Sequence, residues 1–146
     1  MSDDLYSIDL LTLAAGIPRL GALDAPDATS RKVSKLCGSW LELDLDMAPG
    51  PDGEAVVADA AVRLQACALG QASAAVLMAN IVGASADELE AGRDALKAML
   101  KEGGPAPEGR FAGLSALAEV RNYPQRHAST LLAFEAAAEA ARRAAG

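Results

Sequence analysis

The sequence is poor in aromatic residues, cysteine and histidine. Aromatic side chains make up 3% of its 146 residues although hydrophobic residues make up 51%, so the apolar content is mostly Ala, Leu and Val. Two cysteines, Cys37 and Cys67, are too few for the disulfide framework of a secreted domain. With His127 as the one histidine, few residues can carry nucleophilic or metal chemistry.

Excess positive charge and long apolar runs are also lacking. The formal net charge is −7, whereas nucleic acids and anionic membrane surfaces attract clustered Lys and Arg. No apolar run approaches the roughly 18 residues of a membrane span, and the acidic start of the chain does not look like a secretory signal. We therefore expect a cytoplasmic protein without nucleic-acid or membrane partners, compatible with a basic protein partner.

The strand pattern predicts an α+β fold in a single domain over residues 1–146. Residues 41–47 alternate strictly between apolar and acidic side chains, which predicts a strand with one buried and one wet face. A second alternating run, residues 56–66, places Ala58 on its buried face and follows a turn rich in Pro and Gly. Residues 31–36 are a weaker candidate, so we expect a small antiparallel sheet of three strands.

Helices are expected before and after these strands. Their predicted ranges are residues 4–15, 70–82, 85–101, 111–120 and 129–145. The second range is apolar almost all round, which predicts a buried helix, and Gly83 is expected to end it. Ser85 and Glu88 form a capping-box pattern at the start of the third range. Strands grouped early and helices grouped late predict helices that cover one face of the sheet.

Cys37 and Cys67 are the candidate residues for chemistry. Cys37 precedes Gly38 at the junction of two strands and is either a small buried hydrophobe or an accessible thiol. Cys67 follows a strand and precedes the buried helix, where backbone N–H groups favour a thiolate or a metal ligand. The alternative is a thiol that only packs in the core. A nucleophilic pair of Cys67 with His127 is a formal alternative, but no oxyanion motif accompanies it. We expect no catalytic residues.

Short motifs occur along the chain in an order that resembles one family. Residues 17–21 (IPRLG) follow the opening helix, residues 35–38 (KLCG) contain Cys37, residues 64–74 (LQACALGQASA) contain Cys67, and residues 120–126 (VRNYPQR) and 132–136 (LAFEA) precede and form part of the last helix. Over nearly its whole length the sequence resembles the U-type scaffolds of iron–sulfur cluster assembly, which include the N-terminal domain of NifU, IscU and SufU.

The resemblance also implies a changed metal site. In the family, three cysteines with an aspartate or a histidine bind zinc or the nascent cluster. Here Ser39 stands in place of the aspartate and Ser129 in place of the third cysteine. The resemblance implies Cys37 and Cys67 as ligands or sulfur acceptors, with Ser129, Ser39 and His127 as weak candidate ligands. One chain offers too few strong ligands for a complete site, because zinc and [2Fe–2S] clusters are usually held by four ligands.

The resemblance leaves several roles open. The first is a non-enzymatic scaffold or carrier that binds a transient iron–sulfur cluster or zinc, or accepts sulfur from a cysteine desulfurase. Two protomers could share a cluster in a homodimer. The alternative is a degenerate relative that binds no metal and acts as a regulatory or interaction module of the assembly machinery.

Overall fold

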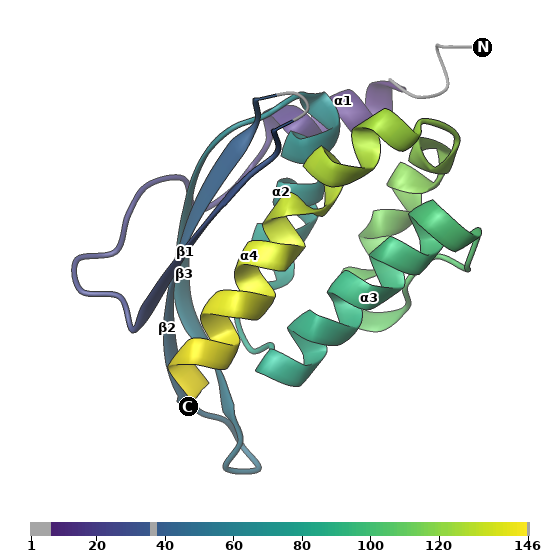
Figure 1. Cartoon of the computed structure of the whole chain (residues 1–146). Coiled ribbons are helices and arrows are strands. Elements are labelled where there is room, and N and C mark those ends of the chain that lie inside the picture. Colours follow the sequence, from purple (N-terminus) through teal and green to yellow (C-terminus); the bar gives the residue numbers. More distant parts are fainter. Residues whose placement is uncertain (1–6, 36–37, 146) are drawn as a thin grey trace.

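The computed structural model of the protein describes residues 7–35 and 38–145. A short helix comes first, three strands follow, and helices occupy the rest of the chain (Figure 1). The elements are α1 Ile8–Ala15, β1 Ala28–Val33, β2 Trp40–Pro49, β3 Ala55–Gln65, α2 Ala68–Asn80, α3 Ala86–Glu102, the 3-10 helices η2 Gly109–Asn122 and η3 Pro124–Arg126, and α4 His127–Ala145. This order confirms the predicted α+β class.

The three strands form one antiparallel sheet in the order β1-β2-β3. The strictly alternating run forms β2, the central strand, which pairs with a neighbour along both edges. Its apolar residues Leu41, Leu43 and Leu45 are fully buried on one face, as the alternation of side chains in a strand requires. Helix α4 runs along this face, α2 lies beside α4, and α3 packs against α4 farther from the sheet (Figure 1).

A β-bulge changes which side chains of β3 face the core. Asp46 pairs with Asp59 but the next residue, Met47, pairs with Val57, so the register passes over Ala58. The extra residue interrupts the alternation, which leaves Val57 buried and Ala58 exposed. The prediction that placed Ala58 on the buried face is wrong, because a shift in register cannot be read from the alternation of one strand.

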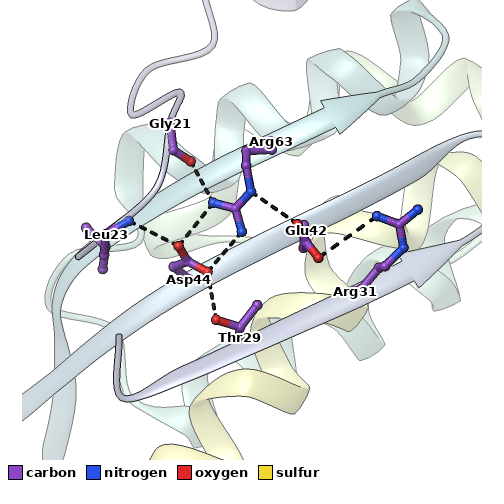
Figure 2. Close-up of polar contacts among 7 residues, drawn as sticks. All are labelled: Gly21, Leu23, Thr29, Arg31, Glu42, Asp44 and Arg63. Carbon is purple, nitrogen blue, oxygen red and sulfur yellow. Dashed lines mark hydrogen bonds and ion pairs between the residues drawn. The ribbon is translucent and has the colours of Figure 1, made fainter. Parts of the chain in front are cut away.

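The outer face of the sheet holds an ion pair between the buried Asp44 and the half-buried Arg63 (Figure 2). Asp44 is 3% exposed, and each of its carboxylate oxygens accepts a hydrogen bond of 3.0 Å from Arg63. Thr29 Oγ1 and the Leu23 N–H also donate to this carboxylate, while Arg63 donates to the Gly21 carbonyl. Burial raises the pKa of Asp44, but the hydrogen bonds outweigh burial and hold that pKa below its usual value. The prediction of a uniformly wet face is wrong at Asp44, because the segment before β1 crosses over it.

Helix α2 is buried as predicted but ends earlier than predicted. Its last residue is Asn80, and the backbone N–H of Gly83 donates to the Val57 carbonyl of β3 at 2.8 Å instead of capping α2. The end of α2 is closed by Arg110, whose guanidinium donates to the carbonyls of Asn80 and Val82. The role predicted for Gly83 is therefore wrong, because an arginine thirty residues along the chain satisfies these carbonyls.

The later helices follow the predicted order with changed ends. The capping box is present: Ser85 Oγ accepts from the Glu88 N–H at 3.1 Å, and the Glu88 carboxylate accepts from the Ser85 N–H at 3.4 Å. The helix predicted over residues 111–120 is a 3-10 helix, and α4 begins at His127 rather than at Ser129. Within residues 7–35 and 38–145, no helix combines the length and the apolar character needed to cross a membrane.

Candidate functional site

Cys67 is the N-cap residue of α2. Its backbone is extended, with φ −66° and ψ 170°, and its side chain makes no capping hydrogen bond. Gln71 fixes this end of the helix, because its backbone N–H donates to the Cys67 carbonyl and its side-chain amide donates to the Ala66 carbonyl, both at 2.9 Å. The half-buried thiol is thus held at a helix N-terminus, where the local backbone dipoles favour negative charge.

Ser129 lies beside this thiol. The distance from Cys67 Sγ to Ser129 Oγ is 3.5 Å, and the serine is 2% exposed. The Ser129 hydroxyl donates to the Arg126 carbonyl at 3.2 Å, so its oxygen remains able to accept a hydrogen bond from the thiol. The first turn of α4 therefore brings the position expected for a third ligand into contact with Cys67.

The close approach of α2 and α4 depends on Gly70. A Cβ atom at this position would lie 3.1 Å from the Ser129 carbonyl oxygen and 3.0 Å from the Ala66 Cβ atom. Both distances are shorter than ordinary van der Waals contacts. A side chain at this position would force its neighbours to shift by a few tenths of an ångström where the first turn of α2 passes the backbone of Ser129.

An open pocket of about 260 Å³ adjoins the thiol. It is lined by Gly38, Ser39, Gln65, Ala66, Cys67 and Arg126. The turn that leads into β2 is closed by two backbone hydrogen bonds, from Gly38 N–H to the Ser34 carbonyl at 2.9 Å and from Ser34 N–H to the Ser39 carbonyl at 2.8 Å. Gly38 has a φ of +73°, a left-handed conformation that glycine adopts without strain. The pocket thus lies where β2 starts, β3 ends, α2 starts and η3 leads into α4.

The other candidate ligands have different positions. Cys37 lies outside the described residues. Ser39 is 4% exposed and lines the pocket with Cys67. His127 is 5% exposed and does not line the pocket; its Nε2 atom lies 3.0 Å from the Val120 carbonyl. Because that carbonyl can only accept, Nε2 donates and is not available as a metal ligand or as a base for Cys67 in this arrangement.

Among the described residues, the groups at the site that could bind a metal are therefore the Cys67 thiol and the hydroxyls of Ser129 and Ser39. No group of three or more His, Cys, Asp or Glu side chains within residues 7–35 and 38–145 could hold a metal ion. A serine hydroxyl stays protonated near neutral pH and is a weak ligand for zinc or iron, which prefer thiolate and imidazole.

Sequence reasoning missed the roles of Gly70 and Arg126. Both residues fall within the motifs that resemble the scaffold family, but composition and periodicity assign them no function. Gly70 matters through a contact with α4, nearly sixty residues along the chain, and Arg126 matters because the η3 turn carries it to the pocket. Pro124, within residues 120–126, is the one local signal here, because proline is a residue type that interrupts helices.

Comparison with known proteins places this chain and its fold in a family. No family model matches the chain. A crystal structure of the N-terminal part of a NifU-like protein from Brucella abortus is 50% identical, with a TM-score of 0.91 over 97% of this chain and 95% of that one. The chain belongs to the NifU/IscU/SufU-like family. This confirms the resemblance that the sequence motifs carry.

Two further proteins are similar to this chain. This chain is 26% identical to the iron–sulfur cluster assembly scaffold protein IscU of Thermotoga maritima over 136 residues, which are 93% of this chain and 92% of that protein. A crystal structure of a putative iron–sulfur cluster assembly scaffold protein for the SUF system from Fervidobacterium islandicum is 21% identical and has the same fold, with a TM-score of 0.81 over 96% of this chain and 98% of that one.

Proposed function

We propose that this chain is a non-enzymatic scaffold or carrier in iron–sulfur cluster assembly and that Cys67 holds its cargo. The observation that carries the proposal is the position of this thiol, at the N-terminus of α2, on an open pocket and in contact with Ser129. The IscU relative is a scaffold of this assembly process. The cytoplasmic location expected from the sequence stays a prediction.

Cys67 can accept sulfur from a persulfide on a cysteine desulfurase. In this transfer the Cys67 thiolate attacks the terminal sulfur, the sulfur–sulfur bond to the donor cysteine breaks, and the donor leaves as a thiolate. Cys67 then carries the persulfide, and no oxidant is consumed. The N–H groups at the start of α2 favour the negative charge on sulfur before and after the transfer.

A complete cluster requires more donors than Cys67. We propose Cys37 as the second thiolate, since Gly38, the residue that follows it, lines the same pocket. Ser129 and Ser39 place hydroxyl groups at the site but are weak ligands. Because a [2Fe–2S] cluster takes four ligands, usually thiolates, a homodimer that supplies two thiolates from each protomer is the arrangement that the residues support best. A zinc ion bound by one chain would also lack the four protein ligands that it usually has.

One observation favours a second function, that of a regulatory module without metal. The described residues contain no three-ligand group, and the position of the third cysteine is occupied by Ser129, which is buried and hydrogen-bonded to Arg126. Such a module would bind a protein of the assembly machinery and would carry neither iron nor sulfide.

Mass spectrometry after sulfur transfer tests the proposal. The protein is incubated with the cysteine desulfurase of the same organism and with cysteine, and the mass of intact chains is measured without reductant. We expect an added sulfur atom on the wild type and on Cys37→Ser, and none on Cys67→Ser. Sulfur addition that persists in Cys67→Ser would contradict the role of Cys67, and no addition to any variant would favour the regulatory module.

A further inference from the structure

The two edges of the sheet differ in how their backbone groups are used. The edge of β3 is covered at two points, because residues 19–21 exchange backbone hydrogen bonds of 3.0 Å with Val62, and residues 83–84 exchange hydrogen bonds of 2.8 and 2.9 Å with Val57. β1 forms the other edge. No backbone hydrogen bond joins residues 28–33 to any described residue outside the sheet. The outer edge of β1 is therefore open.

Three residues of β1 direct their backbone groups toward this open edge. The Ser34 N–H donates to the Ser39 carbonyl at 2.8 Å, in the register that continues the pairing of β1 with β2. Hydrogen-bonded and non-hydrogen-bonded pairs alternate along an antiparallel ladder, so Thr29, Arg31 and Val33 lie at non-hydrogen-bonded positions. Their N–H and C=O groups are available to a further strand.

A charged groove of about 630 Å³ lies beside β1 and is lined by residues of β1, α3 and α4. Its lining includes four carboxylates and five cations, which are Lys32, Arg93, Lys97, Arg142 and Arg143. The groove is thus slightly positive, although the chain carries −7 and as a whole favours a basic partner. Glu139 binds Lys32 and Arg143 at 2.8 and 2.9 Å, whereas Lys97 makes no ion pair or hydrogen bond with any described residue.

A strand added to β1 would present alternate side chains to this groove. The side chains of Ser30 and Lys32 donate hydrogen bonds of 2.7 and 2.8 Å to Glu139 of α4, on the inner face of the sheet. Those of Thr29 and Arg31 lie on the outer face (Figure 2). Because side chains alternate along a strand, every second side chain of the added strand would point to the inner face, where the groove lies.

We propose that residues 28–33 and the groove beside them, together named the strand-docking site, bind an extended acidic segment of another protein by strand addition. Backbone hydrogen bonds to β1 supply the affinity, and acidic side chains at alternate positions meet the cations of the groove, where Lys97 is free to form an ion pair. A second copy of this chain does not fit, because it would bring Arg31 and Lys32 of the two copies together, and like charges on neighbouring strands repel.

The strand-docking site is separate from the pocket at Cys67. The described linings of the groove and of the pocket share no residue, and the residues of α4 that line the groove lie at least six positions after Ser129. A partner bound along β1 therefore leaves the thiol accessible. This docking goes beyond the proposed function and does not depend on it.

A peptide titration followed by nuclear magnetic resonance tests the strand-docking site. The probe is a synthetic peptide of alternating Glu and Thr residues, longer than the six residues of β1, and the control probe has Lys in place of Glu. Backbone amide signals and their hydrogen-exchange rates are recorded for the wild type and for Lys97→Glu. The matched control is Lys101→Glu, which reverses an exposed cation on the same helix that does not line the groove.

A backbone variant complements the charge variants. Val33→Pro removes one N–H from the open edge, and an edge strand tolerates proline where its N–H faces away from the sheet. Thermal melting confirms that each variant is folded. If Val33→Pro does not fold, Lys97→Glu carries the test, because its side chain is exposed on α3.

We expect the acidic peptide, and not the Lys peptide, to shift the amide signals of β1 and to slow hydrogen exchange at its open edge. Lys97→Glu and Val33→Pro should each weaken binding about fivefold, with Lys101→Glu within about twofold of the wild type. Binding should be unchanged in Cys67→Ser, so failure of the strand-docking site is distinguishable from failure of the cargo role.

Several results would overturn the proposal. One is an acidic peptide that does not bind, or that binds no better than the Lys peptide. Others are equal affinities of Lys97→Glu and Lys101→Glu, and signal shifts confined to elements other than β1 and the groove. Shifts of β1 signals that grow with protein concentration in the absence of peptide would show that a second copy occupies the edge instead.

Discussion

At the scale of single residues, the site is defined by a contact between one thiol and one hydroxyl. Cys67 Sγ and Ser129 Oγ are 3.5 Å apart, a distance at which two side chains could reach a common metal ion with bonds of about 2.3 Å. The serine cannot use this position well, because its hydroxyl is neutral and already donates to the Arg126 carbonyl. The positions of these atoms suit a metal site, but the chemistry of Ser129 weakens it.

Restoring a thiol at position 129 should strengthen metal binding. We predict that Ser129→Cys binds zinc with at least tenfold higher affinity than the wild type, since a second thiolate would lie next to Cys67. Competition with a chromophoric chelator measures this affinity. The control is Ser73→Cys, a fully buried serine farther along α2 that does not line the pocket; an equal gain in this control would contradict the prediction.

At the scale of elements, the site exists because α2 and α4 meet at their first turns. Gly70 permits the meeting, since a Cβ atom there would lie 3.1 Å from the Ser129 carbonyl oxygen. Cys67 follows the end of β3, and Arg126 is the last residue of η3, just before α4. The geometry of the pocket therefore depends on how these elements pack. A substitution at the contact between α2 and α4 should change the reactivity of the Cys67 thiol although Cys67 itself is unchanged.

Gly70→Ala tests this dependence. We predict a loss of about 1–3 kcal/mol in the free energy of unfolding, because the methyl group must displace α2 or α4. We also expect faster alkylation of Cys67 by iodoacetamide in a Cys37→Ser background, because the thiol loses its contact with Ser129. Gly113→Ala is the matched control, since its Cβ atom would make contacts of 3.4 Å and longer with Val76. Equal stability and equal alkylation rates in the two variants would refute the role of Gly70.

A second element contact joins α4 to β1 through Glu139. The hydrogen bonds from Lys32 and Ser30 lower the pKa of Glu139 to about 2, from a usual value of 4.5. A carboxyl group with a lowered pKa stabilises the fold fully above its unfolded pKa and loses this contribution as the pH falls. The contact should therefore stabilise the protein above pH 4.5 and weaken progressively between pH 4.5 and 2.

Denaturant unfolding at several pH values tests this contribution. We predict that Glu139→Gln is less stable than the wild type at pH 7 and that the difference shrinks toward zero near pH 2. Glu102→Gln, at an exposed end of α3 and without an ion pair among the described residues, should match the wild type throughout. A difference for Glu139→Gln that does not change with pH would show that packing, not the charge, stabilises this contact.

At the scale of the whole molecule, alternation and capping signals were sufficient to predict the layers. The alternation of β2 predicted its buried leucines, and the apolar character of α2 predicted its burial, because both patterns are local. The burial of Asp44, the bulge at Ala58 and the closure of α2 by Arg110 were not predictable, since each depends on a segment distant in the sequence. Cys67 and Ser129 could be named from the family motifs, but their contact required the packing of α2 on α4.

The central claim is that Cys67 holds the cargo of an iron–sulfur scaffold. Its most direct test is the iron and sulfide content and the absorbance spectrum of the protein after reconstitution without oxygen, compared with Cys67→Ser and with the Cys37→Ser, Cys67→Ser double variant. The account predicts iron, sulfide and visible charge-transfer bands in the wild type, near half a cluster per chain if two protomers share it, and their loss in both variants. A wild type that stays bare, or a double variant that still takes up iron and sulfide, would contradict it.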